Sequence, residues 1–167
     1  MIDIIPAILE NELDLIEEKV AHVAPFVLWV QIDFSDGTLL PSLSFLEIDK
    51  FKSLISKFPN LSFEAHLIVD DPVKYLRKLA DAGFKRVIAH VEANDPRNFL
   101  DEAKFESIEI GLALDTPTDL DVIEPFAEEV DVVLLQMSEA GDKNQPIQTE
   151  QIEKIIALRE HFPQIAI

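Results

Sequence analysis

The chain has 167 residues, with 14 basic and 32 acidic side chains, which gives a formal net charge of −18. A surface this acidic repels nucleic-acid phosphates and anionic membranes, so we expect neither as a partner. The chain has no cysteine and no apolar run of the roughly 20 residues that a membrane span needs. These features predict one domain and, because thiol chemistry is absent, fit a cytoplasmic location.

Strand-like and helix-like patterns alternate along the sequence. Strand patterns cover 2–9, 26–34, 61–69, 85–92, 108–114 and 130–137, and 164–167 resembles the start of a seventh strand. Helical spacing of apolar residues begins near 13, 51, 72, 95, 116 and 149, and the helix that begins near 116 is expected to run to about 127. Such alternation predicts a parallel sheet with helices outside it.

Two architectures fit this alternation: an open doubly wound sheet and a (β/α)₈ barrel. Pro6-Ala7-Ile8-Leu9 follows the first strand in place of a glycine-rich phosphate loop, which disfavours the dinucleotide-binding version. Polar residues at the carboxyl ends of successive strands favour the barrel. Because a full barrel needs about 250 residues, we predict an incomplete barrel, one domain over 1–167. Its exposed sheet edges predict a homo-oligomer or edge-strand pairing.

Polar side chains share one face of three consecutive predicted strands, since alternate residues of a strand point the same way. They are Gln31, Asp33, Glu64, His66, His90 and Glu92. Carboxylate and imidazole are ordinary ligands of Zn, Fe or Mn, so Asp33 and His66 are candidate ligands of one divalent metal. The remaining residues are candidates for substrate binding or for orienting the ligands. The alternative is that an inward-facing histidine is a hydrogen-bonded core residue, and we favour it for His90.

Several motifs resemble the ribulose-phosphate 3-epimerase family, in order over the whole chain. They are Ile-Ile-Pro-Ala-Ile-Leu at 4–9, Gln-Ile-Asp-Phe-Ser-Asp-Gly at 31–37, Glu-Ala-His-Leu-Ile-Val at 64–69 and Ala-His-Val-Glu-Ala at 89–93. The resemblance implies a barrel that binds D-ribulose 5-phosphate and two Asp residues that exchange its C3 proton. It also implies a divalent metal held by two His and two Asp. Asp33 would then be a metal ligand and one acid/base, and His66 a second ligand.

The sequence also departs from the family pattern. Ala7 replaces a Ser, Gln31 replaces a metal-binding His, and Ser35 and Ile68 replace Met residues. The family's glycine-rich phosphate loop corresponds to 138–145, which retains Gly141 as a candidate substrate-binding residue. The family's second catalytic Asp belongs to a position after residue 167.

Two functions remain open. One is an isomerase of the epimerase type, acting by metal-assisted proton transfer at C3 of a ketopentose phosphate in carbohydrate metabolism. The other is a non-catalytic sugar-phosphate-binding or assembly protein on the same barrel. A related barrel decarboxylase is disfavoured because 64–69 lacks the Lys that its Asp-x-Lys-x-x-Asp motif needs.

Overall fold

The computed structural model describes residues 2–138 and 149–167, and its strands form one parallel sheet. The strands are β1 (Ala7–Ile8), β2 (Trp29–Ser35), β3 (Ser62–Ile68), β4 (Arg86–His90), β5 (Glu109–Leu114) and β6 (Val132–Leu135). The α-helices are α1 (Leu13–Val23), α2 (Phe51–Ser56), α3 (Val73–Ala82), α4 (Pro96–Ala103) and α5 (Thr149–His161). The short 3₁₀ helices are η1 (Ile48–Lys50), η2 (Leu120–Val122) and η3 (Glu124–Glu129).

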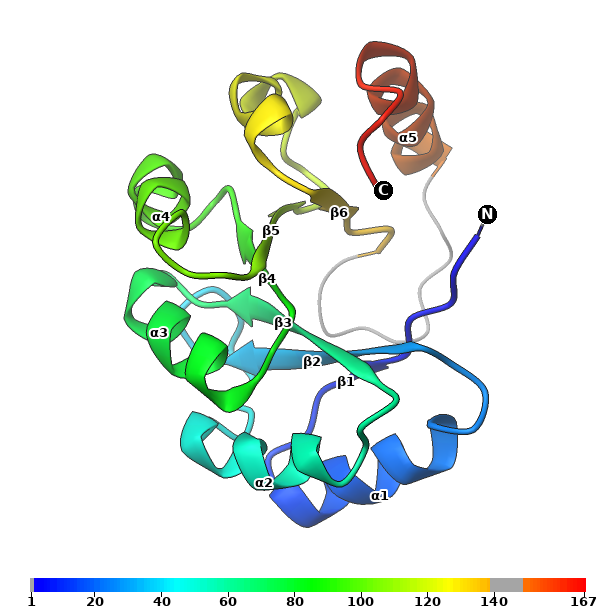
Figure 1. Cartoon of the computed structure of the whole chain (residues 1–167). Coiled ribbons are helices and arrows are strands. Elements are labelled where there is room, and N and C mark those ends of the chain that lie inside the picture. Colours follow the sequence, from blue (N-terminus) through cyan, green and yellow to red (C-terminus); the bar gives the residue numbers. More distant parts are fainter. Residues whose placement is uncertain (1, 139–148) are drawn as a thin grey trace.

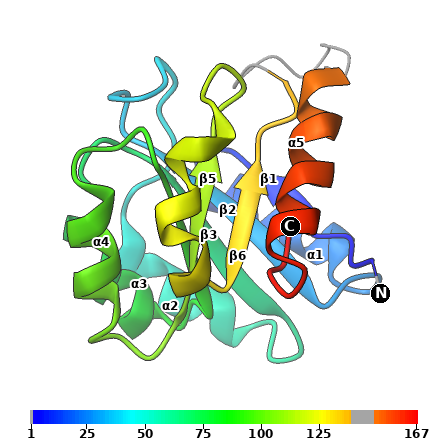
Figure 2. The same cartoon turned by 90° about the horizontal axis from the view of Figure 1, so that it is seen from above.

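The strands follow one another across the sheet in chain order, from β1 to β6, and each pairs in parallel with the next. A doubly wound sheet would reverse its strand order at a switch point, so this topology is that of a barrel. Figure 1 shows the sheet curving, with the helices outside it, and Figure 2 shows the same arrangement from above. The predicted incomplete (β/α)₈ barrel is therefore confirmed.

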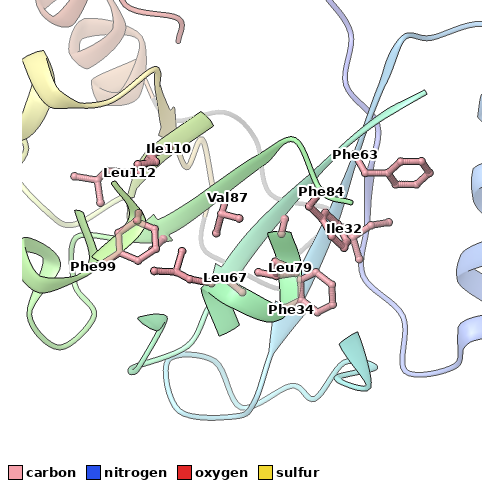
Figure 3. Packing of buried hydrophobic residues seen from close by; sticks show 14 of the residues in the cluster. Ile32, Phe34, Phe63, Leu67, Leu79, Phe84, Val87, Phe99, Ile110 and Leu112 are labelled. Carbon is pink, nitrogen blue, oxygen red and sulfur yellow. The ribbon is translucent and has the colours of Figure 1, made fainter. Parts of the chain in front are cut away.

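The larger hydrophobic core lies between the sheet and the helices. Alternation along β2 sends Val30, Ile32 and Phe34 to this outer face, where each is at most 1% exposed. Phe34 packs edge-on against two other buried rings, Phe51 at 5.2 Å and Phe84 at 5.8 Å between centroids. Figure 3 shows Ile32, Phe34 and Phe84 among the packed side chains of this core. Burial of this apolar surface is the main force that holds the helices on the sheet.

The inner face of the sheet has a separate, smaller apolar cluster. It consists of Ile88, Ala113 and Val132, with Leu134 packed against them. Gly111 of β5 lies in the same region, where a Cβ would come within 2.5 Å of Val132 Cγ1. Gly111 itself is thus closely surrounded, and the polar side chains of the inner face lie on β2, β3 and β4.

Two helix ends carry residues that are typical of their positions. Gly83 ends α3 with φ of 104°, a left-handed conformation that glycine adopts without strain. Asp95 begins α4, where its Oδ1 accepts a hydrogen bond of 3.0 Å from the amide of Asn98. Pro96 follows at the first helical position, where a missing N–H costs nothing.

Several expected elements differ in the structure, and the second strand begins at Trp29 instead of residue 26. The first strand, expected over 2–9, is reduced to Ala7–Ile8; Ile2 and Ile4 are 94% and 77% exposed and bury nothing that would fix an edge strand. The helix expected over 116–127 is two short 3₁₀ helices, because Pro125 cannot donate the hydrogen bond that an α-helix needs there. The sixth strand is shorter than expected, at Val132–Leu135.

The segment expected to open a seventh strand makes one parallel bridge, between Ala166 and Val132. The amide of Val133 donates to the carbonyl of Ala166 at 2.9 Å, so the segment does lie alongside β6. Both chain ends lie on the open side of the curved sheet (Figures 1 and 2). The predicted homo-oligomer or edge-strand pairing stays a prediction. Among the described residues, no helix combines the length and apolarity that crossing a membrane requires.

Candidate functional site

The site is built on neighbouring strands whose register brings Asp33 and His66 side by side. Asp33 of β2 is the register partner of His66 of β3, and both side chains point to the inner face. Asp33 Oδ1 lies 3.1 Å from His66 Nδ1. The same oxygen accepts a hydrogen bond of 2.7 Å from Gln31 Nε2, two residues earlier on the strand. The structure thus brings together three of the residues singled out from sequence.

His90 continues this contact on β4. Its Nε2 lies 2.9 Å from His66 Nε2, and the two rings stack with centroids 4.9 Å apart at an angle of 25°. The side chains of His66 and His90 are only 1% and 5% exposed. Two buried imidazoles in contact are costly to desolvate, so their hydrogen bonds to each other and to carboxylates are what stabilise them.

Glu92, just beyond the end of β4, is the last residue in this series of contacts. Its Oε2 lies 3.1 Å from His90 Nδ1, and its Oε1 accepts a hydrogen bond of 2.9 Å from the amide of Asp115. A continuous series of contacts therefore runs from Asp33 through His66 and His90 to Glu92. We call these four residues the relay.

Two of the relay residues, His66 and Glu92, have pKa values that are shifted by their surroundings. Burial lowers the pKa of His66 below its ordinary value, although the neighbouring Asp33 carboxylate opposes this effect. Burial alone would raise the pKa of Glu92. Hydrogen bonds from His90, Thr118 and the Asp115 amide outweigh burial and lower the pKa of Glu92 to about 2. Glu92 is therefore a carboxylate at neutral pH and only accepts hydrogen bonds.

Glu64 lies on the same face but belongs to a different cluster. Its carboxylate accepts a hydrogen bond of 2.7 Å from Arg86 Nη1, and Arg86 also pairs with Glu109. The guanidinium lies over the Trp29 ring, 4.4 Å from its centroid. Burial raises the pKa of Glu64 despite the attraction of Arg86. Among the described hydrogen bonds, the partner of Glu64 is Arg86. The contacts of Glu64 therefore do not support the expectation that it orients the metal ligands.

Sequence reasoning missed Arg86, although the signal was present. Arg86, Ile88 and His90 alternate along β4, so the period of a strand places all three on the inner face. Arg86, Glu64 and Gln31 line a cavity of about 540 Å³ together with apolar residues that include Ile88. Asp33 and His66 are not part of its lining.

The loop after β2 is fixed to α3. Asp36 Oδ2 accepts hydrogen bonds from Lys74 Nζ at 3.2 Å and from Tyr75 Oη at 3.4 Å. Burial alone would raise the pKa of Asp36, but hydrogen bonds from Thr38 and Lys74 outweigh it and lower the pKa. Asp36 thus ties the loop after β2 to α3. Gly141, the candidate in the phosphate loop, lies outside the described residues.

Asp33 and His66 form one carboxylate–imidazole pair on the inner face, and Glu92 and His90 form another at the same distance of 3.1 Å. One carboxylate oxygen and one imidazole nitrogen face each other, which is the mixed donor set that Zn, Fe and Mn accept. Within 2–138 and 149–167, no group of three or more His, Cys, Asp or Glu side chains is placed to hold a metal ion. Asp33 and His66 by themselves would supply two of the ligands of such a cation.

The fold and the site together define a partial (β/α)₈ barrel with a carboxylate–imidazole centre at the carboxyl ends of its strands. The sequence profile of the ribulose-phosphate 3 epimerase family matches residues 3–167, and the chain belongs to this family.

Curated relatives agree with this assignment. The chain is 27% identical to ribulose-phosphate 3-epimerase of Schizosaccharomyces pombe, over 98% of this chain and 73% of that protein. It is 28% identical to the Eremothecium gossypii protein of the same name, over 83% of this chain and 62% of that protein. The chain thus spans less than two thirds of the second relative.

Solved structures agree on the fold. A 3-hexulose-6-phosphate synthase superposes with a TM-score of 0.67 at 11% identity, covering 92% of this chain and 74% of that one. The Salmonella typhimurium protein of the same name gives a TM-score of 0.67 at 16% identity, covering 95% and 74%. Similarity at this level of identity concerns the barrel and not the chemistry.

Proposed function

We propose that this chain catalyses proton transfer at C3 of a ketopentose phosphate, with Asp33 as an acid/base, in carbohydrate metabolism. The observation that carries the proposal is the position of Asp33, on the inner face of a family barrel and in contact with His66. A carboxylate can take a proton next to a carbonyl group if the negative charge that forms is stabilised. The relatives' names supply the substrate class, ribulose phosphate.

Asp33 would hold the substrate proton, and Gln31 and His66 would position Asp33. The hydrogen bond from Gln31 Nε2 to Asp33 Oδ1 fixes the carboxylate on the strand. A divalent cation held by Asp33 and His66, when bound, would stabilise negative charge on the substrate's carbonyl oxygen. We place this chemistry in the cytoplasm, as in a rice relative named as the cytoplasmic isoform.

The test is exchange of the C3 hydrogen of D-ribulose 5-phosphate with solvent deuterium, followed by NMR. Asp33 is the one acid/base that the family resemblance locates within these 167 residues. Asp33→Asn should slow exchange at least 100-fold, in line with the contribution of general acid–base groups.

The matched control is Asp70→Asn, which makes the same change at an exposed position just after β3. It should leave the exchange rate unchanged. An exchange rate in Asp33→Asn equal to that of the unmodified chain would contradict the proposal.

A second candidate function is binding of the sugar phosphate without turnover. The observation that favours it is Gln31, whose Nε2 donates to Asp33 where the family pattern has a metal-binding His. An amide is a much weaker ligand than imidazole. This alternative predicts that D-ribulose 5-phosphate raises the melting temperature while no deuterium enters C3.

A further inference from the structure

Four large apolar side chains are exposed together beside the first strand. We call them the edge patch, and they are Ile2, Ile4, Phe26 and Leu28, each between 73% and 94% exposed. All four line one cavity of about 590 Å³, whose lining includes no residue of the relay. Exposed apolar side chains that gather in this way mark a site of interaction with another molecule.

The cavity of the edge patch is nearly free of charge on an otherwise acidic chain. Asp3 is the one charged residue among the ten that line it, whereas the whole chain has 32 acidic and 14 basic side chains. A basic partner would be attracted more strongly by the acidic remainder of the surface than by this patch. Two copies of the chain repel each other over most of their surface, so they associate most easily where acidic residues are sparse. The distribution of charge therefore favours a second copy as the occupant.

The backbone beside the edge patch is an open edge of the sheet. β1 pairs with β2 on one side, and no described strand pairs with β1 on the other. The backbone groups of 2–5, which lead into β1 in Figure 1, make no hydrogen bond with any described residue. An unpaired edge of this kind is a template for a strand of another chain.

The pairing of β1 with β2 determines which of these backbone groups face outward. The carbonyl of Pro6 accepts a hydrogen bond of 2.9 Å from the amide of Gln31, so the backbone of Pro6 faces β2. In an extended strand, the N–H and C=O groups of alternate residues point to opposite sides. When 2–6 extends β1, the groups of Asp3 and Ile5 therefore face outward. Pro6, which has no N–H, does not occupy an outward position and so does not block the edge.

One antiparallel register brings the edge patches of two copies into contact. With Ile4 on the two-fold axis, Ile4 lies opposite Ile4 of the second copy, and Asp3 lies opposite Ile5. The outward N–H and C=O groups of Asp3 and Ile5 then exchange hydrogen bonds in both directions. The neighbouring register, in which Ile2 lies opposite Ile4, would place Asp3 opposite Asp3, and like charges in that position are destabilising.

We propose that two copies of this chain associate through residues 2–6, which pair as antiparallel edge strands and bring the two edge patches into contact across a two-fold axis. The same surface serves both copies, as a two-fold dimer requires. The backbone hydrogen bonds determine the register, and burial of Ile4 against Ile4 of the second copy removes apolar surface from water. The proposal is independent of the proposed function, because Asp33 and His66 do not line this cavity.

Sedimentation equilibrium of the full chain over a range of concentrations provides the first test. We expect a dimer, and Ile4→Asp should weaken it at least tenfold because two carboxylates would then face each other on the axis. Ile4 is 77% exposed, so this variant should fold like the unmodified chain. Raising the salt from about 0.1 M to 1 M shortens the Debye length from about 10 Å to 3 Å. The dimer of the unmodified chain should become tighter, because the acidic surfaces then repel each other less.

The matched control is Phe105→Asp. Phe105 is also a large apolar residue, 81% exposed, but it follows α4 and does not line the cavity of the edge patch. This variant should dimerise like the unmodified chain. An equal loss of dimer in Phe105→Asp and Ile4→Asp would contradict the assignment of the interface to the edge patch.

Amide hydrogen exchange followed by NMR tests the pairing of the edge without any variant. The amides of Asp3 and Ile5 should exchange at least tenfold more slowly as the dimer forms, because they then donate to the second copy. The amide of Ile4, which faces β2, should slow less. Three results would overturn the proposal: a monomer even at submillimolar concentration, a dimer that Ile4→Asp leaves intact, or a dimer in which the amides of Asp3 and Ile5 are not protected.

Discussion

Replacement of Arg86 by methionine should strongly destabilise the fold, because it leaves a buried carboxylate without its partner. The side chain of Glu64 is 4% exposed, and Arg86 Nη1 lies 2.7 Å from its Oε2. Breaking a buried pair by removing one partner costs about 3–5 kcal/mol. Methionine keeps part of the apolar contact with Trp29, so we expect a loss of about 3 kcal/mol in the free energy of unfolding at pH 7.

Because the pKa of Glu64 is raised, the loss of stability in Arg86→Met should also depend on pH. Burial already raises the pKa of Glu64 in the paired state, and removal of Arg86 removes the attraction that opposes this rise. A carboxyl with a raised pKa in the fold binds protons more readily there than in the unfolded chain. The cost of Arg86→Met should therefore be largest at neutral pH and shrink as the pH falls and Glu64 is protonated.

Urea unfolding of three variants provides the assay. The double variant Glu64→Met with Arg86→Met should regain most of the lost stability, since an apolar pair often replaces a buried ion pair without loss. The control is Arg77→Met, because Arg77 pairs with Asp81 and Glu106 on the surface with its side chain 75% exposed. It should show no measurable change. A double variant as unstable as Arg86→Met alone would refute the reasoning.

Two further predictions concern packing and acid stability. Gly111→Ala should cost about 1–3 kcal/mol in urea unfolding, because its Cβ would lie 2.5 Å from Val132 Cγ1 and 2.9 Å from Ile88 Cγ1. Adding Val132→Ala should recover part of that loss; no recovery would mean that the crowding is not at Val132. The pKa of Glu92 falls from 4.5 to about 2 on folding, so its carboxylate stabilises the fold above pH 4.5, and this stabilisation is lost as the pH falls toward 2. The unmodified chain should exceed Glu92→Gln by at most about 3 kcal/mol at pH 7 and by less at pH 3, whereas a constant difference would contradict the assignment.

The sequence predicted most of the fold because hydrophobic periodicity is local. Alternation along β2 and β3 placed Asp33 and His66 on one face, and the repeated strand–helix order predicted the parallel sheet. The secondary-structure predictions failed at segments whose local strand or helix propensity is not supported by the rest of the fold. Ile4 reads as a strand residue but is 77% exposed, and Pro125 interrupts a segment whose apolar spacing suggests a helix.

The candidate site was only partly accessible from sequence. The pairing of Asp33 with His66 was a sound hypothesis, since both lie on neighbouring strands at similar depth. The contact between His66 and His90 could not be predicted from the sequence. The register partner of His66 is Ile88, so the two histidine rings meet diagonally across the strands. The contact of Glu64 with Arg86 was likewise not predicted, because it depends on the register that makes the two residues partners.

The sequence by itself determined which side chains face the barrel interior, since side-chain direction in a strand depends on the parity of position alone. Only the tertiary structure decided which of those side chains touch. Contacts between strands depend on register, and a shift of one residue between strands would change every neighbour. The series of contacts from Asp33 to Glu92 therefore belongs to the folded sheet and to no local segment of the chain.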